Sequence, residues 1–395
     1  MDAYYRPTWV EVSLDALSGN LQAFRQALPD SIRIMAVVKA DAYGHGAASI
    51  AREAIASGAD HLAVAFLDEA LQLREAGISA PILVLGYTAP DGLEMALKNS
   101  ITLTVFNEEM LRGMELLQGQ AEALDKRLRV HVKVDSGMHR IGLYKEEEAV
   151  SYLKQIARMP HICLEGLFTH YACADEADKA YTRLQYEKFS RVVHEVKRLG
   201  IDIPYIHAGN SAAAIDTPEL VYNMARLGIA MYGLYPSEKV DHTIIKLEPV
   251  MSLKTRMIHD KWLSEGSGIS YGTIYHTKGE ERIGTLPIGY ADGFSRMLST
   301  KANALIRGKR VPIVGRICMD QCMLNITGVP EAEAGDEVVL IGRQGDEVIP
   351  AEEIAGHLGT INYEVTCMMA HRIPRVYVKE GRIVEVKNVL HHHST

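Results

Sequence analysis

The chain has 395 residues, of which 47% are hydrophobic and 23% are charged, a size typical of two or three domains. Its 42 Lys and Arg residues against 50 Asp and Glu residues give a formal charge of −8, which argues against a broad surface for nucleic acid or anionic membranes. With no apolar run near the ~20 residues of a membrane helix, no visible secretory signal and an odd number of cysteines, we expect a cytoplasmic protein without a disulfide framework.

The first 235 residues alternate short apolar runs with amphipathic stretches. Eight runs have the length and composition of strands: residues 34–40, 62–66, 81–86, 101–106, 128–135, 162–170, 205–210 and 227–232. Helical periodicity fills most of the intervals, at residues 47–57, 68–76, 108–124, 146–158 and 180–199. Eight strands joined by helical crossovers predict an α/β fold, a (β/α)8 barrel of the TIM type. A doubly wound sheet is the alternative, and the count of eight favours the barrel.

After Pro236 the pattern changes to short β-type runs. They occupy residues 252–259, 283–288, 304–317, 337–341 and 375–386, and the last contains a hairpin turn at Lys379-Glu380-Gly381-Arg382. Only residues 351–357 have a clear helical pattern. We therefore expect a barrel over residues 1–240 and a mainly β domain over residues 241–395, with the early run 9–14 available to pair with the β domain. The terminal His-His-His-Ser-Thr is either the native end or an added tail, and we expect no metal site in it.

Lys39 ends a run predicted to be a buried parallel strand, in Val37-Val38-Lys39-Ala-Asp-Ala-Tyr43-Gly44-His45-Gly46. A strand-end lysine commonly reaches solvent along its aliphatic stem. In a barrel, however, the carboxyl ends of the strands form the active-site face, and a partly desolvated lysine can form Schiff bases. The glycines also imitate a dinucleotide-binding fingerprint, but the third-glycine position holds Ser49, so we do not favour a nicotinamide site.

The fifth predicted strand carries polar side chains on one face. His131, Lys133 and Asp135 alternate with valines, so these three residues point the same way. Because barrel strands are normally apolar on both faces, this stripe is either a salt-bridged structural network or part of a site. Arg140 follows shortly afterwards and is suited to binding a carboxylate.

Two histidines and two small-residue motifs lie near the ends of the last three predicted strands. His170 and His207 could be structural core residues, but their position at strand ends also fits a functional role. Asn210-Ser211 and Gly228-Ile229 offer backbone N–H groups where barrel enzymes commonly bind phosphate, although such residues are also ordinary in loops.

In the second half, Tyr271, Tyr290 and Tyr363 each stand beside turn-type or polar residues. Taken singly, each is explained by an amphipathic strand. Cys318 and Cys322 have a CxxxC spacing with no second ligand pair, so we expect no zinc site and no other metal.

The segment around Lys39 closely resembles the cofactor-lysine motif of alanine racemases, which are pyridoxal-phosphate enzymes of barrel type. The resemblance continues in order through residues 133–142, 166–175, 207–211, 223–233, 270–272, 287–293, 315–322, 341–348 and 360–365. It implies an isomerase that interconverts L-alanine and D-alanine and supplies D-alanine for bacterial peptidoglycan. It does not distinguish that role from alanine catabolism.

The resemblance also implies how pyridoxal 5'-phosphate is held. Lys39 would bind it covalently, and its phosphate would be bound by a set of residues from both domains: Tyr43, Ser211, Tyr363, and the backbone of Gly228 and Ile229, next to Asn210. Arg226 would face the pyridine nitrogen, with His207 behind it and His170 nearby. Because arginine stays protonated, it should not donate a full proton to that nitrogen, which disfavours a long-lived carbanion and argues against decarboxylase relatives.

By the same resemblance, two bases act on opposite faces of Cα. Lys39 would be the base for D-alanine and Tyr271 the base for L-alanine, with His170 activating the phenol because a group of pKa near 10 is a poor base at neutral pH. The other matching positions have supporting roles: Arg140 and the Met319 backbone N–H for the substrate carboxylate, Tyr290 and Tyr363 for the pocket entrance, Cys318 and Asp320 beside Met319, and Lys133 as a lysine that is carbamylated in many relatives.

The family forms homodimers in which each site is completed by the partner's β domain, so the resemblance implies a dimer. Two alternatives remain open. A broader amino-acid racemase on the same scaffold is one, and the other is a non-catalytic pyridoxal-phosphate carrier, which resembles the barrel alone.

Overall fold

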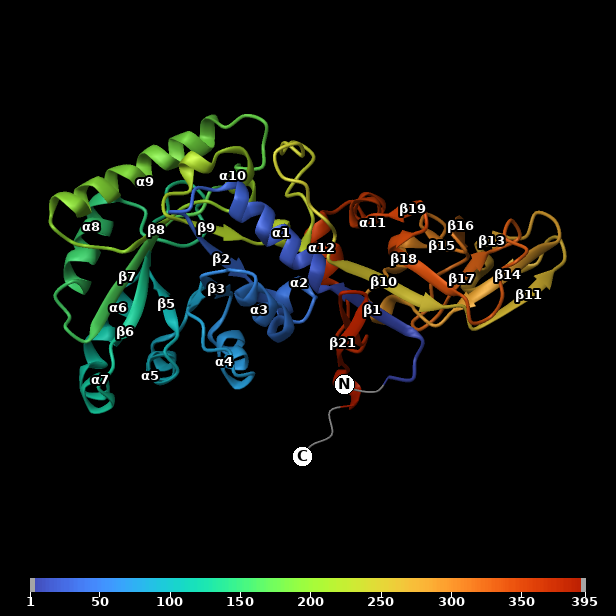
Figure 1. Cartoon of the computed structure of the whole chain (residues 1–395), viewed down its shortest axis with the longest axis horizontal. Helices are drawn as coiled ribbons and strands as arrows, with labels where there is room; N and C mark the ends of the chain where they lie inside the picture. Colours follow the sequence, from blue (N-terminus) through green and yellow to red (C-terminus); the bar gives the residue numbers. More distant parts are fainter. Residues whose placement is uncertain (1–3, 392–395) are drawn as a thin grey trace. The chain divides into compact units, whose positions relative to one another are not determined.

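The computed structural model describes residues 4–391, which form two compact units (Figure 1). One unit comprises Leu17–Ala42 and Ala47–Glu248. The other comprises the segment that ends at Ala16, the short segment Tyr43–Gly46, and the chain from Pro249 onward. Each unit is built around its own large sheet. The end of the His-His-His-Ser-Thr run lies outside the described residues.

The first unit is a parallel eight-stranded sheet with the order β8-β7-β6-β5-β4-β3-β2-β9. Its strands are β2 (Arg33–Val37), β3 (His61–Val64), β4 (Ile82–Val84), β5 (Thr102–Val105), β6 (Leu128–Lys133), β7 (Ile162–Phe168), β8 (Tyr205–His207) and β9 (Met224–Leu227). The edge strands meet, because Asn223 N donates to Ile206 O at 3.2 Å and Arg226 N donates to Gly209 O at 3.1 Å. The sheet is therefore a nearly closed barrel, which confirms the predicted fold class and excludes the doubly wound alternative.

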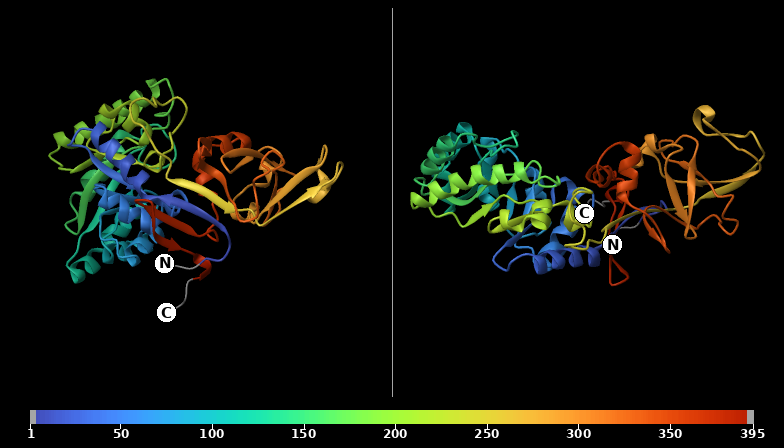
Figure 2. Two further views of the ribbon diagram at one scale, coloured as in Figure 1. Left: turned by 45° about the vertical axis from the view of Figure 1, so that its right-hand side comes forward. Right: turned by 90° about the horizontal axis from the view of Figure 1, so that it is seen from above.

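Helices connect these strands and lie on the outside of the curved sheet (Figures 1 and 2). They are α1 (Leu14–Ala27), α3 (Ala47–Ala56), α4 (Leu67–Glu75), α5 (Leu93–Lys98), α6 (Glu108–Leu116), α7 (Gln118–Leu124), α8 (Glu146–Ile156), α9 (Ala180–Arg198) and α10 (Ser211–Asp216). All residues of β3, β4, β5 and β9 are buried, as expected for strands covered by helices on one side and packed inside a barrel on the other. The carboxyl ends of the strands thus form one face that gathers the loops.

The second unit holds an 11-stranded sheet, which runs β11-β14-β17-β16-β15-β18-β10-β1-β20-β21, with β19 paired to β18. The strands are β1 (Thr8–Ser13), β10 (Met251–Arg256), β11 (His259–Leu263), β14 (Glu281–Leu286), β15 (Asn303–Ile306), β16 (Lys309–Val314), β17 (Cys322–Asn325), β18 (Glu337–Gln344), β19 (Glu347–Ile349), β20 (Arg375–Lys379) and β21 (Arg382–Lys387). A small hairpin, β12 (Gly268–Ile269) with β13 (Tyr275–His276), and two helices, α11 (Ala351–Leu358) and α12 (Asn362–Cys367), complete it. The early strand β1 pairs with β10 and β20.

Several sequence predictions of secondary structure were wrong. The last barrel strand is Met224–Leu227, and most of the predicted run 227–232 is a short 3-10 helix, Ile229–Tyr232. The predicted helix 108–124 is two helices, which meet at Leu117. Residues 351–357 are not the only helix of the β unit, because Asn362–Cys367 is also helical. Some predicted strands also divide: residues 304–317 form the hairpin of β15 and β16.

Among residues 4–391, no helix is both long and apolar enough to cross a membrane. None of the five cysteines forms a disulfide. No group of three His, Cys, Asp or Glu side chains in the described part of the chain is placed to hold a metal ion.

Candidate active site

Lys39 stands where β2 passes into an unusual left-handed turn, labelled α2 (Lys39–Tyr43) in Figure 1. Ala40, Asp41 and Ala42 all have φ between 51° and 55°. L-residues pay about 1–2 kcal/mol each for this conformation, so the turn needs external support. Ala40 N donates to Glu69 Oε1 at 2.6 Å, and Asp41 Oδ1 accepts from Ala47 N at 2.7 Å. Such supported strain is typical of functional sites, and here it fixes the chain directly after Lys39.

The glycines that follow Lys39 serve the backbone and do not form a dinucleotide site. Gly44 and Gly46 have φ of 85° and 98°, which other residues rarely adopt. A Cβ on Gly44 would lie 2.2 Å from Thr366 O, and one on Gly46 would lie 1.8 Å from the Tyr377 hydroxyl. Both glycines are therefore required by close packing within the β unit.

Cationic side chains gather at the carboxyl end of the barrel strands. Lys133, the last residue of β6, is only 5% exposed, and its ammonium lies 5.2 Å from the ring centre of Phe168. Burial, and after it the charges of Arg140, Arg226 and Lys39, lower the pKa of Lys133 to about 7, against the opposing effect of Asp135. Four predicted site residues, Lys39, Lys133, Arg140 and Arg226, are thus within electrostatic reach of one another, and together they give this end of the barrel positive charge.

Arg226, on β9, is buried, and its guanidinium group contacts several neighbouring residues of the barrel. Its Nη2 donates to Thr169 O at 3.0 Å and to Ala208 O at 2.9 Å, and lies 3.0 Å from His170 Nδ1. Its Nη1 lies 2.8 Å from His207 Nδ1. Burial lowers the pKa of Arg226 to about 10, which leaves it charged at neutral pH. Nε of Arg226 makes no hydrogen bond within residues 4–391.

Both histidines that contact Arg226 are neutral. Burial and the charge of Arg226 hold the pKa values of His170 and His207 well below the usual value. Because guanidinium nitrogens are donors only, the Nδ1 atoms must accept, so the ring proton of each histidine is on Nε2. His207 also stacks on Phe168, with ring centres 4.7 Å apart. The two histidines therefore belong to one hydrogen-bonded group around Arg226.

The small-residue motifs at the ends of β8 and β9 come together. Ser211 Oγ accepts from Gly228 N at 2.9 Å and from Ala230 N at 3.4 Å. Asn210 caps α10, because its side chain accepts from Ala213 N at 3.1 Å. Ile229 begins the 3-10 helix that follows Gly228. Backbone N–H groups and a hydroxyl thus converge at the place where barrels commonly bind phosphate.

The polar stripe on β6 divides between two tasks. Asp135 Oδ1 accepts from Gly137 N and His139 N, both at 3.0 Å, and so shapes the loop that carries the exposed Arg140. Lys133 belongs to the cationic group, whereas His131 points into the barrel, with its Nδ1 2.9 Å from His207 Nε2. The stripe therefore includes structural hydrogen bonds, and the role of Lys133 in a site stays a prediction.

In the β unit, Tyr43 and Tyr363 face each other with ring centres 6.2 Å apart. Burial raises the pKa of Tyr43, and so do Tyr363 and Cys367 nearby, so its hydroxyl is protonated at neutral pH. Tyr271, in contrast, is 71% exposed. The chain just before it is also unusual, since Ser270 has a φ of 63° and its hydroxyl donates to Arg316 O at 2.7 Å.

A buried carboxylate organises the loops that carry Tyr290 and Met319. Asp292 is fully buried and accepts from Arg372 Nε at 2.7 Å and from Gly289 N at 3.0 Å. The two loops are joined directly, because Tyr290 N donates to Cys318 O and Ala291 N donates to Met319 O, both at 3.0 Å. Arg372 Nη2 also donates to Asp320 at 2.6 Å.

Sequence reasoning missed Asp292, Arg372, Thr169 and Glu165. Arg372 and Asp292 are 80 residues apart in sequence, and no local pattern connects them. Thr169 acts through its backbone carbonyl, which its side chain does not reveal. Glu165 offered one signal, a carboxylate inside a strand predicted to be buried.

The predicted site residues lie in both units. The structure places Tyr271, Tyr290, Met319 and Tyr363 in the β unit and the cationic group in the barrel unit.

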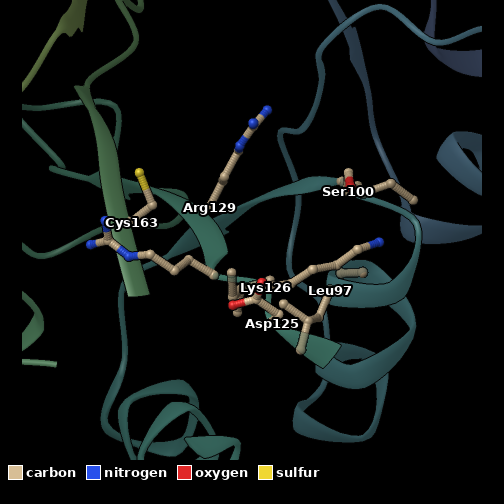
Figure 3. A pocket seen from close by; sticks show the side chains of 10 residues that line it. Leu97, Ser100, Asp125, Lys126, Arg129 and Cys163 are labelled. Carbon is tan, nitrogen blue, oxygen red and sulfur yellow. The ribbon is translucent and has the colours of Figure 1, made fainter. Parts of the chain in front are cut away.

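A surface pocket of about 380 Å³ lies at the other end of β6, near the start of that strand (Figure 3). It is lined by Lys126, Arg129, Asp125, Cys163 and residues of α5. Lys126 already donates to Lys98 O at 2.6 Å. None of the predicted site residues lines this pocket.

Two family profiles match the chain: alanine racemase, N-terminal domain, over residues 12–236, and alanine racemase, C-terminal domain, over residues 250–377. An alanine racemase of Methanococcus maripaludis is 47% identical over 372 residues, which cover 94% of this chain and 99% of that protein. An alanine racemase of Geobacillus stearothermophilus is 46% identical over 391 residues, covering 99% and 98%.

Solved structures give the same result. The crystal structure of an alanine racemase from Bacillus anthracis with bound L-Ala-P has a TM-score of 0.91 and 44% identity, covering 98% of this chain and 99% of that one. A histidine racemase from Leuconostoc mesenteroides has a TM-score of 0.88 and 31% identity, covering 96% and 100%. The fold, the order of the motifs and matches over both units agree, and the chain belongs to the alanine racemase family.

Proposed function

We propose that this protein is an isomerase that interconverts L-alanine and D-alanine with pyridoxal 5'-phosphate as its cofactor. The observation that carries the proposal is the cationic group formed by Lys39, Lys133, Arg140 and Arg226 at the carboxyl end of the barrel strands, in a chain that belongs to this family. The group has a lysine to bind the cofactor and an excess of positive charge to bind anions.

The residues present fit the cofactor chemically. Its phosphate is a dianion, and we assign its binding to Ser211 and to the backbone N–H of Ile229, the first residue of the 3-10 helix after β9. Gly228 N already donates to Ser211, so it holds that hydroxyl in place. Tyr43 and Tyr363 are the phenols that the resemblance assigns to the same phosphate.

When bound, pyridoxal phosphate withdraws electrons from Cα of the amino acid and so makes its proton acidic. Arg226 limits that withdrawal. Nε–H makes no hydrogen bond within residues 4–391, and it is the donor that we assign to the pyridine nitrogen, while Nη1 and Nη2 contact protein groups. A guanidinium that stays charged donates a hydrogen bond without transferring its proton.

Two bases on opposite faces of Cα would move the proton. Lys39 is proposed for D-alanine and Tyr271 for L-alanine. The neutral His170 carries its proton on Nε2 and can stabilise the phenolate of Tyr271 by donating to it, which would bring the phenol into a useful range as a base. Arg140 and the backbone N–H of Met319 are proposed to bind the substrate carboxylate.

Lys133 is proposed to be carbamylated. Its pKa of about 7 leaves much of the amine neutral, and a neutral amine adds CO2 to form a carbamate with release of one proton. The product replaces a cation with an anion beside Arg140 and Arg226. It would relieve the repulsion in the cationic group and fix the side chain of Arg140.

We further propose a cytoplasmic homodimer in which Tyr271, Tyr290 and Met319 of the partner subunit complete each site. Their exposure supports this arrangement, because in the single chain Tyr271 is 71% exposed, Tyr290 41% and Met319 53%. A proton-transferring phenol and a pocket entrance need to be shielded from bulk water. The proposed cellular role is the supply of D-alanine for peptidoglycan.

The amino-acid range separates this proposal from its nearest alternative, a broader racemase, which the 31% identity to a histidine racemase makes worth testing. Purified protein is incubated with L-alanine, L-serine or L-histidine, with and without added pyridoxal phosphate, and the D-enantiomers are measured. We expect D-alanine to dominate and to increase with cofactor. Comparable rates with L-histidine would favour a broad racemase, and binding of the cofactor without any racemisation would favour a carrier protein.

A Lys39→Ala variant should lose both the racemase activity and the visible absorbance of the covalently bound cofactor. The matched control is a Lys254→Ala variant, which should retain both. Lys254 is a partly buried lysine of the β unit whose ammonium lies 2.8 Å from Glu11.

A further inference from the structure

A column of polar side chains crosses the barrel interior behind Arg226. Nη1 of Arg226 lies 2.8 Å from His207 Nδ1, and His207 Nε2 lies 2.9 Å from His131 Nδ1. Nε2 of His131 then faces Glu165 Oε2 at 3.7 Å, longer than a normal hydrogen bond but close enough for strong charge attraction. The same oxygen accepts from Thr102 Oγ1 at 3.1 Å.

The backbone is shaped to make room for this column. The pairing of β6 with β7 shifts between Val130 and His131, so that Glu165 is an inserted residue opposite no partner. Such bulges redirect side chains. The next residue is Gly166, where a Cβ would lie 2.4 Å from Cγ of His131. The inserted carboxylate and the glycine therefore accommodate the imidazole of His131.

The charges at the two ends determine where the protons are. Arg226 can only donate, so His207 accepts at Nδ1 and carries its proton on Nε2. That proton is donated to His131 Nδ1. His131 consequently carries its own proton on Nε2, facing the carboxylate of Glu165. A cation at one end and an anion at the other thus specify the same tautomer for both histidines.

The protonation states support this direction. Burial lowers the pKa of His131, although Glu165 opposes the effect. Burial and the charge of Arg226 hold the pKa of His207 well below its usual value. For Glu165, burial alone would raise the pKa, but the contacts with His131, Thr102 and Arg129 lower it overall. The column therefore consists of one cation, two neutral imidazole rings and one anion: Arg226, His207, His131 and Glu165, in that order.

We propose that His131 and Glu165 are positioning residues for the reaction: they fix the Nε2–H tautomer of His207, and His207 in that state holds the guanidinium of Arg226. A His207 protonated at both nitrogens could not accept from Arg226 and would repel it. The inference rests on the proposed function, because it concerns how Arg226 is presented to the cofactor. The carboxylate end lies beside Arg129, 3.9 Å away, at the pocket of Figure 3.

The first test is independent of activity. Protein labelled with 15N in its histidine rings is studied by solid-state NMR, and the resonances of His131 and His207 are assigned from single variants. Both rings should be neutral and protonated at Nε2, in the presence and absence of cofactor. A doubly protonated His207, or one protonated at Nδ1, overturns the proposal. Failure of the racemase assay would leave this result unaffected, so the two ideas fail separately.

The second test compares two substitutions of similar volume. In His131→Gln, the amide oxygen can accept from His207 and the amide N–H2 can donate to Glu165, whereas His131→Leu can do neither. We expect the Leu variant to lower kcat by about tenfold with little change in KM and to weaken binding of pyridoxal phosphate to the apoprotein, and the Gln variant to restore most of both. Equal behaviour of the two variants would mean that His131 only fills space, and would contradict the proposal.

Two controls separate the column from general damage to the barrel. In Gly166→Ala the new methyl group would clash with His131, so this variant should behave like His131→Leu. Gly113→Ala is the control, because its Cβ would lie 2.8 Å from Leu93 Cδ1 and would disturb the packing of α6 outside the column. His161→Gln alters a buried histidine whose Nε2 lies 2.7 Å from Met114 O, outside the column, and should leave cofactor binding unchanged. If the Leu variant does not fold, the tautomer measurement decides alone.

Discussion

At the residue scale, the most informative property is the pKa of Lys133. Its value of about 7 results from burial first and from three neighbouring cations second. The buried ammonium is disfavoured in the folded protein, so the amine is mostly protonated below pH ~7 and mostly neutral above it. This places a potential nucleophile for CO2 among groups that attract an anion.

We predict that a carbamate on Lys133 is visible by 13C NMR when the protein is equilibrated with 13C-labelled CO2. At a fixed CO2 concentration its signal should grow as the pH rises from about 6 to about 8, because only the neutral amine reacts. A Lys133→Met variant should lose the signal, and Lys254→Met should retain it. A protein that shows no carbamate signal at any of these pH values would contradict the prediction.

Tyr271 provides the second prediction at this scale. Tyr271→Phe should reduce exchange of the Cα proton of L-alanine by roughly 10²–10⁴-fold, because the proposed base for that enantiomer loses its hydroxyl. Tyr275→Phe is the matched control: its hydroxyl donates to Glu281 Oε2 at 2.7 Å, so the change should affect local packing and leave the exchange rate near that of the wild type. Equal rates for the two variants would remove Tyr271 from the mechanism.

At the element scale, we predict that the short helix α10 links stability to cofactor binding. Asn210→Ala removes the cap on Ala213 N and should cost about 1 kcal/mol, lowering the melting temperature by about 2–4 °C. Asn107→Ala removes an equivalent cap on Met110 N in α6 and should lower it similarly. Only the Asn210 variant should also weaken binding of pyridoxal phosphate, measured by titration of the apoprotein. Equal binding of pyridoxal phosphate by both variants would show that α10 does not contribute to cofactor binding.

Sequence patterns predicted the barrel because each strand is a short apolar run between amphipathic stretches. They failed where apolar composition does not change at the end of an element. Leu227 is followed by Ile229–Tyr232, which is equally apolar but forms a 3-10 helix, so the last strand was placed too late. Helix α12 was missed because a single turn-length segment with Val365 and Thr366 has little helical signal.

The candidate site was predictable where chemistry and motif coincide, as at Lys39, Ser211 and Arg226. It was not predictable where a residue acts through distant neighbours. Glu165 meets His131 only because of a bulge between β6 and β7, and no property of the isolated strand indicates that irregularity. The left-handed turn after Lys39 was also invisible, since its residues have no composition that favours positive φ.

At the scale of the whole molecule, the proposed dimer predicts complementation between two inactive variants. Lys39→Ala and Tyr271→Phe subunits are each purified, mixed, unfolded and refolded together. A mixed dimer would contain one site with both substitutions and one site with neither, so the mixture should regain roughly a quarter of the wild-type activity. The separately refolded variants are the controls. No recovery in the mixture would indicate that both residues act within one subunit.

The measurement that tests the central claim most directly is the fate of the Cα hydrogen when the protein acts on L-alanine in deuterated water. Because different groups would remove and return the proton on opposite faces, we predict D-alanine that carries deuterium at Cα from the first turnovers, as measured by chiral separation and mass spectrometry. Absence of D-alanine, or D-alanine that retains its original hydrogen, would contradict a two-base alanine racemase.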